Sequence, residues 1–327
     1  MPLLLSEKEV RAVLPMSDLI GAMAGALSEF SAGRVVQPVR QVLDVGKDPS
    51  FFAVMPAALD EPAAVGAKLV TVYSRNHDRG LPSHLATIIL LDHATGALVA
   101  LVDGRYITEA RTAAVSAVSV KLLARPEAQT LAIIGSGVQA RSHLEAIRHV
   151  RTLKDVRVWS PNRPHLESCV REMAASTGLP IRAARDADSA VQAADIIVLA
   201  TSSRTPVIGS TAVSPGAHVC AVGACRPDQR EMPTDLVTRG RVFVDSRAAA
   251  LKEAGDVLLP IGEHAVTETH ILAELGAVAA GLAPGRLSTS DITIFKSLGL
   301  AVEDVVAANL VVERARAAGL GQSFDLS

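Results

Sequence analysis

The chain has 327 residues, of which 49% are hydrophobic and 20% charged, an ordinary composition for a folded protein of two domains. Lys and Arg together number 32 against 34 Asp and Glu, and aromatic residues make up only 3%. This balance excludes a globally basic surface for nucleic acid or anionic membranes, and it disfavours an aromatic platform that stacks bases.

The sequence gives no sign of secretion or of a membrane anchor. No apolar run reaches the roughly 18 residues of a membrane span, and the start, MPLLLSEKEV, lacks the basic region of a signal peptide. The three cysteines, Cys169, Cys220 and Cys225, form no C-x-x-C motif, so neither a disulfide framework nor a zinc site is expected. We therefore expect a cytoplasmic protein without membrane, nucleic-acid or metal partners.

The first part of the chain mixes helices with alternating strands. Ser6 and Glu9 have the spacing of a capping box, and Met16–Phe30 is apolar at helical spacing. A second helix with small residues on one face is predicted over Thr108–Leu123. Between them lie strand-like runs, several separated by Gly or Pro: Val39–Val45, Phe51–Met55, Ala67–Tyr73, Ala86–Leu91 and Ala97–Asp103.

After Arg125-Pro126, short apolar strands alternate with helices. The predicted strands are Thr130–Gly135, Val156–Trp159, Asp195–Ala200, His218–Gly223 and Val242–Asp245. This alternation predicts an α/β fold of the Rossmann type, with a doubly wound parallel sheet. The last helix, about Ala301–Ala318, is predicted to return to the first domain. We thus expect a discontinuous α+β domain (1–124 and 300–327) and a dinucleotide-binding domain (125–299).

A glycine-rich motif joins the first of these strands to a helix. The residues Gly135-Ser136-Gly137-Val138-Gln139-Ala140 read G-x-G-x-x-A. The first glycine permits a tight turn, the second lets a pyrophosphate approach the backbone, and the alanine allows the helix to pack closely on the strand. The motif alone is also compatible with an ordinary glycine turn, but the βαβ context favours dinucleotide binding.

The end of the second strand favours NADPH over NADH. NAD-specific sites usually carry an acid there for the ribose 2′-hydroxyl. The sequence instead has Ser160, Asn162 and Arg163, which could bind a 2′-phosphate. The alternative for Arg163 is a solvated loop charge, so NADH stays possible.

Further segments resemble the ornithine cyclodeaminase/mu-crystallin family over nearly the whole chain, most closely its ketimine reductases. The resemblance rests on ordered matches that include QPVR (37–40), VMPA (54–57), AKLV (67–70), LPSHLAT (81–87), ITEARTAA (107–114), AVGACRPD (221–228), VDS (244–246), LKEAGDV (251–257) and FKSLG (295–299). It implies a nicotinamide-dependent enzyme, a dimer joined through the first domain, and a substrate with a carboxylate next to an amine or imine carbon.

The resemblance also implies roles for individual residues. Arg40, Lys68 and Arg111 would bind the substrate carboxylate, and Arg111 would also lie near the cofactor. Bland alternatives are an exposed strand arginine, an outward-facing lysine and a partner of Glu109. Cofactor contacts are expected from the glycine-rich motif and from a set of residues at strand ends and neighbouring loops: Ser83, His84, Thr201, Val222 and Ser297. His84 could deliver a proton or be structural, and Thr201 and Ser297 could be turn residues.

Two pocket residues separate the possible activities. The cyclodeaminases have an aspartate where this chain has Cys225, and mu-crystallin-like members have serine. We expect Cys225 to line the pocket without covalent chemistry. Glu253 could balance an iminium charge, or it could pair with Lys252 or Arg247 on the surface.

These residues lead to three hypotheses. The first is NADPH-dependent reduction of a cyclic ketimine carboxylate, either Δ1-pyrroline-2-carboxylate or Δ1-piperideine-2-carboxylate. The second is an ornithine cyclodeaminase or amino-acid dehydrogenase, which the missing aspartate disfavours. The third is a non-catalytic NADPH- or ligand-binding protein, which the basic trio disfavours.

Overall fold

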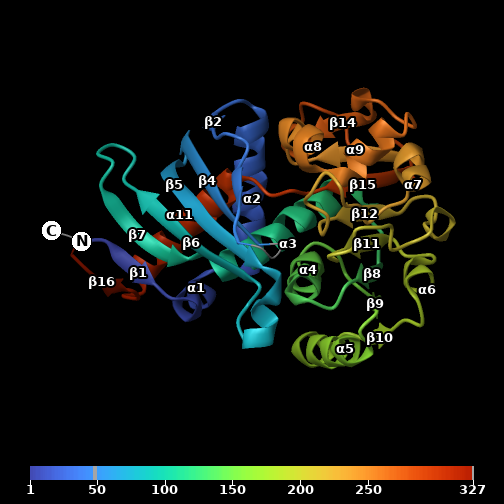
Figure 1. Ribbon diagram of the computed structural model, residues 1–327, viewed down its shortest axis with the longest axis horizontal. Helices are drawn as coiled ribbons and strands as arrows, with labels where there is room; N and C mark the ends of the chain where they lie inside the picture. The colour runs from blue at the N-terminus through green and yellow to red at the C-terminus, as the bar shows by residue number, and fades with distance from the viewer. Residues whose placement is uncertain (47–49, 326–327) are drawn as a thin grey trace. The chain divides into compact units, whose positions relative to one another are not determined.

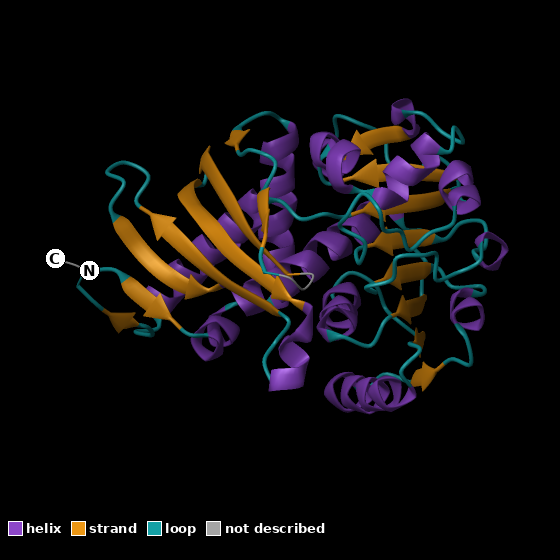
Figure 2. Ribbon diagram, viewed as in Figure 1, coloured by secondary structure: helices purple, strands orange, loops and turns teal. Residues whose placement is uncertain are grey.

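The computed structural model describes residues 1–46 and 50–325 and divides into two compact units. Unit 1 comprises Met1–Arg111 and Leu300–Ser327, and unit 2 comprises Thr112–Gly299. Figure 1 follows the chain through both units, and Figure 2 distinguishes their strands from their helices.

Unit 1 is built on one largely antiparallel sheet. Among the described residues its order is β16-β1-β7-β6-β5-β4-β2, with β3 paired to β4 and only β1 and β7 parallel. The strands are β1 (Leu3–Leu5), β2 (Val35–Val36), β3 (Gln41–Asp44), β4 (Ser50–Asp60), β5 (Ala63–Tyr73), β6 (His84–Leu91), β7 (Leu98–Asp103) and β16 (Gln322–Ser323). The five strand-like runs in the sequence all fall within or overlap these strands.

Helices cover one face of this sheet. The last helix, α11 (Ala301–Ala317), packs against β4, β5 and β6 and against α2 (Met16–Ser31), so unit 1 is discontinuous in sequence (Figure 1). Before α2 lies α1 (Glu7–Val13), where Glu9 accepts the backbone N–H of Ser6 in the predicted capping box. No single described helix is long and apolar enough to cross a membrane; α1 and α2 pass that test only as a pair, bent by 89°.

Unit 2 contains a wholly parallel sheet of order β10-β9-β8-β11-β12-β15-β13-β14. Its strands are β8 (Thr130–Ile134), β9 (Asp155–Trp159), β10 (Ile181–Ala183), β11 (Ile196–Leu199), β12 (His218–Ala221), β13 (Gly240–Val244), β14 (Ile271–Glu274) and β15 (Ile292–Lys296). The chain proceeds outward from β8 to β9 and β10 and then resumes on the other side of β8 at β11. This change of direction is the switch point at which doubly wound sheets bind ligands, so the predicted fold class is confirmed.

Two hydrophobic cores lie on the two faces of this sheet. Leu131 and Ile133 of β8 belong to one core, and their neighbours Ala132 and Ile134 belong to the other. The first core includes α4 (Val138–Arg148) and α5 (Arg163–Thr177), and the second includes α6 (Ala187–Val191), α7 (Thr234–Arg239), α8 (Arg247–Glu253) and α9 (Gly255–Gly262). A short α10 (Leu275–Ala279) follows β14. Burial on both faces explains why these strands read as continuous apolar runs.

The boundary between the units falls inside a helix, α3 (Gly104–Leu123), instead of at residue 124. Residues 112–124 therefore group with unit 2. Buried hydrogen bonds account for this: Ser116 Oγ lies 2.9 Å from His143 Nε2, and Ser119 Oγ lies 3.0 Å from His218 Nε2. The sequence pattern alone could not reveal these partners, because they join segments far apart in the chain.

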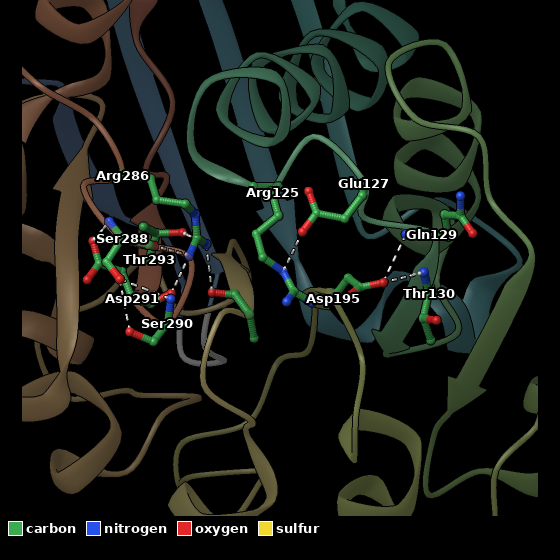
Figure 3. Close-up of polar contacts among 12 residues, drawn as sticks. Arg125, Glu127, Gln129, Thr130, Asp195, Arg286, Ser288, Ser290, Asp291 and Thr293 are labelled. Atoms are coloured by element: carbon green, nitrogen blue, oxygen red, sulfur yellow. Dashed lines mark hydrogen bonds and ion pairs between the residues drawn. The ribbon is translucent and has the colours of Figure 1, made fainter.

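Ion pairs and hydrogen bonds connect the segments at the edge of the parallel sheet where its strands begin (Figure 3). The Asp195 carboxylate pairs with Arg125 and accepts the backbone N–H groups of Gln129 and Thr130 at 2.9 and 3.0 Å. Nearby, Arg286 donates to the Leu123 carbonyl at 2.7 Å. The opposite edge, where the strands end, carries the glycine-rich loop.

Candidate functional site

Unit 1 holds a buried cluster of alternating charges. Lys68 Nζ lies 2.6 Å from Asp304 Oδ2, and the other oxygen of Asp304 accepts Arg111 Nε at 2.9 Å. Arg111 also donates to Glu303 at 2.7 Å. All four residues are buried, with Lys68 only 1% exposed. The bland interpretations of Lys68 as outward-facing and of Arg111 as a partner of Glu109 are therefore wrong.

The cluster forms because β5 and α11 face each other. Along β5 the side chains alternate between buried and half-buried, and Lys68 shares the buried face with Gly66 and Val70. The helix α11 covers that face and brings Asp304 to it from its first turn. The segment that precedes Arg40 is attached to the same helix start, since Gln37 Oε1 accepts the backbone N–H of Val302 at 2.9 Å.

Burial and neighbouring cations make Lys68 unusually acidic. Desolvation, only partly offset by Asp304 and reinforced by Arg111 and Arg40, lowers the pKa of Lys68 to about 8. Lys68 and Arg111 thus lie side by side, and Arg40 is near enough to lower the pKa of Lys68. Such a group of cations attracts a carboxylate more strongly than a neutral ligand.

The histidine next to Ser83 is neutral at physiological pH. Burial first, then the charges of Lys68 and Arg111, lower the pKa of His84 to about 4. His84 begins β6, opposite Val72 of β5, while Ser83 is exposed and its carbonyl accepts the Tyr73 N–H at 2.8 Å. A neutral imidazole can accept a hydrogen bond or orient a ligand, but it holds no proton ready to donate as imidazolium.

The glycine-rich loop of unit 2 fits a dinucleotide pyrophosphate. Gly135 has φ of 123°, and a Cβ there would lie 2.4 Å from the Ala200 carbonyl oxygen, so only glycine fits. A Cβ on Gly137, in contrast, would point into open space. Gly137 is also the N-cap of α4, whose free N–H groups attract anions. Val138 and Gln139 form the first turn of that helix.

The loop after β9 is exposed, and its predicted phosphate-binding residues already have local partners. Asn162 caps α5, where its Oδ1 accepts the His165 N–H at 3.0 Å. Arg163 donates to Glu167, one helical turn along, at 2.8 Å. Ser160 lies directly after the strand. A ribose phosphate would therefore compete with Glu167 for Arg163.

At the carboxyl ends of β11 and β12, a buried carboxylate joins two loops. Glu231 is 0% exposed, and one of its oxygens accepts both the N–H and the hydroxyl of Thr201, at 2.7 and 2.8 Å. Its other oxygen accepts the Gly223 N–H at 2.6 Å. Sequence reasoning placed Thr201 in the site but missed Glu231, which lies in a loop and gives no periodic signal.

A second buried ion pair lies beside this carboxylate. Lys296 Nζ, at the end of β15, is 3.0 Å from Asp256 Oδ2, and both side chains are 0% exposed. Despite desolvation, Asp256 above all, with Cys225 and Glu231, raises the pKa of Lys296. The sequence pattern had singled out only its neighbour Ser297, which is buried and near Asp245.

The remaining predicted residues lie on the same unit. Cys225 is half-buried in the loop after β12, with its sulfur 3.5 Å from the Val222 carbonyl. Val222 itself is 8% exposed. Glu253 is half-buried at the end of α8. Arg247, one of its suggested surface partners, donates to the carbonyls of Glu268 and Ile271.

The switch-point sheet and its glycine loop define the class of protein: one that binds a dinucleotide at the carboxyl edge of a doubly wound sheet. The chain belongs to the ornithine cyclodeaminase/mu-crystallin family, whose model matches residues 1–319.

Named relatives cover nearly the whole chain. It is 42% identical over 316 residues to a ketimine reductase mu-crystallin of Mus musculus, covering 95% of this chain and 97% of that protein. A solved Δ1-pyrroline-2-carboxylate reductase of Thermococcus litoralis, in complex with NADH and L-proline, superimposes with a TM-score of 0.96 at 37% identity, covering 98% and 100% of the two chains. An archaeal alanine dehydrogenase dimer with bound NAD gives 0.94 at 29% identity, covering 100% and 99%.

Proposed function

We propose that this protein reduces a cyclic ketimine carboxylate, Δ1-pyrroline-2-carboxylate or Δ1-piperideine-2-carboxylate, to the cyclic L-amino acid with NADPH. The buried Lys68–Asp304–Arg111 cluster carries this proposal, because it places two buried cations side by side, with Arg40 near enough to influence Lys68, and such cations bind a carboxylate. The reductase names of the mouse and Thermococcus relatives support it.

Each residue that we assign to the site has a distinct role in the proposed reaction. Lys68, Arg111 and Arg40 bind the substrate carboxylate and so fix the orientation of the ring. Asp304 holds both Lys68 and Arg111 in place through its two oxygens. The nicotinamide cofactor, when bound, supplies the hydride. Glu253 stabilises a protonated imine nitrogen, which accepts hydride more readily than a neutral one.

The test is an NADPH-oxidation assay on both cyclic imines. Removing a charge-assisted contact costs about 1.5–3 kcal/mol, so Lys68→Ala and Arg40→Ala should lower kcat/KM by roughly one to two orders of magnitude. The affinity for NADPH should stay near that of the wild type. Wild-type rates in both variants would remove these residues from the site. Efficient conversion of ornithine to proline would instead favour a cyclodeaminase.

The preference for NADPH rests on Ser160 and Arg163 and on the absence of an acid at this strand end. Arg163→Ala should weaken NADPH binding more than NADH binding. Glu167→Gln, which frees Arg163 from its partner at 2.8 Å, should strengthen NADPH binding selectively. The measurement is the Kd of each cofactor by fluorescence titration. A wild-type preference for NADH that neither variant changes would contradict this part of the proposal.

We also propose that the protein is a homodimer formed through the face of the unit 1 sheet opposite α11. In-register neighbours on this face are apolar and half-buried: Pro56, Ala67, Ile89 and Leu101. The archaeal alanine dehydrogenase relative is described as a dimer. Light scattering on the purified protein should give twice the 34.1 kDa chain mass, and Ala67→Arg should reduce it to the monomer.

A further inference from the structure

Glu231 is a buried acid whose carboxylate accepts hydrogen bonds from two separate loops. Three donors converge on its two oxygens, two from Thr201 and one from Gly223. Thr201 follows β11 and Gly223 follows β12, and these strands are neighbours in the sheet. One buried carboxylate therefore fixes the first turns of two adjacent loops.

The backbone of Glu231 is itself held in place. Asp256 Oδ1 accepts the N–H groups of Glu231 and Met232 at 2.8 and 3.0 Å, and its other oxygen faces Lys296 at 3.0 Å. Lys296 is the last residue of β15, the strand next to β12. The chain of contacts Lys296–Asp256–Glu231 thus links the ends of three consecutive strands, β11, β12 and β15.

The packing around Gly223 shows how closely the loops approach each other. A Cβ on Gly223 would lie 2.0 Å from the Thr201 carbonyl oxygen and 2.6 Å from Glu231 Oε1. No side chain fits there, so the backbone N–H of Gly223 reaches the carboxylate directly. An amide in place of the carboxylate would turn an NH2 group toward one of the donors and lose at least one bond.

We propose that Glu231 is a positioning residue for the nicotinamide cofactor, fixing the Thr201 and Gly223 loops at the carboxyl edge of the sheet. Dinucleotides bind at this edge in doubly wound sheets, so a shift of either loop changes the surface on which the cofactor lies. The inference rests on the cofactor class of the proposed function and adds a residue that is not a member of the substrate cluster of unit 1.

The test compares two Glu-to-Gln variants in the same unit. Glu231→Gln removes the buried carboxylate, and Glu263→Gln removes a partly exposed one that pairs with Arg230 at the surface. Cofactor Kd is measured by NADPH and NADH fluorescence titration without imine, together with Tm and amide exchange at Thr201 and Gly223. Glu231→Gln should raise both Kd values at least tenfold and speed exchange at the two amides, while Glu263→Gln changes neither.

Kinetics separate positioning from mere support of the fold. In Glu231→Gln the KM for cofactor should rise while the KM for imine stays constant, because the unit 1 cluster is intact. A lower Tm with unchanged cofactor Kd would overturn the inference. Failure of the wild type to bind any nicotinamide cofactor would instead overturn the proposed function.

A milder variant decides the question if Glu231→Gln does not fold. Thr201→Val removes the hydroxyl bond of 2.8 Å to Glu231 and the bond of 3.2 Å that the same oxygen accepts from the Ser203 N–H, and it keeps the backbone N–H bond to Glu231. It should raise the cofactor Kd about threefold, a smaller change than the full loss of the carboxylate. An unchanged Kd in this variant would count against the positioning role.

Discussion

Lys68 loses its charge at a pH unusually close to neutral for a lysine. Its pKa of about 8 means that the native protein loses this positive charge as the pH rises through about 8. We therefore expect kcat/KM for the imine to fall above this pH, since the free enzyme must carry the charge to attract a carboxylate. Lys68→Arg keeps its charge at every accessible pH and should abolish the fall, although at a lower rate. A wild-type profile that stays flat to pH 9.5 would contradict this.

Substitutions of Cys225 distinguish a reductase of cyclic imines from an enzyme that releases ammonia from an amine. Its half-buried sulfur contacts the Val222 carbonyl at 3.5 Å, as a serine hydroxyl also could. Cys225→Ser should keep most of the imine-reductase activity, because no step needs a thiolate. Cys225→Asp should slow reduction, since its negative charge repels the substrate carboxylate. Steady-state kinetics on Δ1-piperideine-2-carboxylate measure both effects, and a collapse of activity in Cys225→Ser would show that the thiol takes part in the reaction.

Single residues differ in how far the sequence reveals them. Lys68 stands out because a lysine in an apolar strand needs a partner. Its partner Asp304 does not stand out, because an acid in the first turn of a helix is usually exposed and interacts favourably with the helix dipole. The available signal was the first half of α11, residues 301–308, where every residue other than Glu303 and Asp304 is Ala or Val and all eight are buried. Glu231 gave no signal at all, because its donors come from loops brought together only by the fold.

At the scale of elements, the two glycines in the turn from β8 to α4 differ in whether the fold can accept a side chain at their position. In Gly135→Ala, an alanine must adopt a φ of 123°, and its Cβ would lie 2.4 Å from the Ala200 carbonyl oxygen. We therefore expect the free energy of unfolding to fall by about 3 kcal/mol. Gly137→Ala meets no neighbouring atom and should leave Tm unchanged while it weakens cofactor binding. Thermal unfolding and fluorescence titration of both variants check the contrast, which equal Tm losses would refute.

In the parallel sheet, apolar runs predicted β8 and β11, which are buried on both faces, and also β9, whose side chains alternate between half-buried and buried. Sequence patterns missed β10 and β14, which are three- and four-residue strands at the two edges of the sheet. They also missed β15, whose central position is obscured by Lys296 at its end. The pairing of Lys296 with Asp256, which makes this burial tolerable, joins positions 40 residues apart and is invisible to local periodicity.

At the scale of the whole molecule, buried histidines should make the protein sensitive to mild acid. Desolvation lowers the pKa of His143 to about 4 and of His218 to about 3, against an ordinary value of 6.5. Because the unfolded chain takes up protons first, stability is full above pH 6.5 and is lost as the pH falls toward these folded values. Lowering the pH from 7 to 5.5 should therefore reduce the free energy of unfolding by about 2 kcal/mol through these two residues.

Urea denaturation at the two pH values measures this loss. His143 and His218 hydrogen-bond to Ser116 and Ser119 of α3, so the acid-sensitive layer lies beneath that helix. His149, which is exposed, lies outside this layer, and His149→Gln serves as the surface control. Equal unfolding free energies at pH 7 and 5.5 would be inconsistent with neutral buried imidazoles.

The return of α11 to unit 1 has a consequence for synthesis on the ribosome. Arg111 and Lys68 leave the exit tunnel long before Glu303 and Asp304, their partners in the folded protein. At about 5–20 residues per second, roughly 10–40 s of translation separate residue 111 from residue 303. Unit 2, which is continuous from Thr112 to Gly299, emerges complete within that interval. We expect unit 2 to fold first in the nascent chain. Lys68 and Arg111 can form their ion pairs only after α11 has been synthesised.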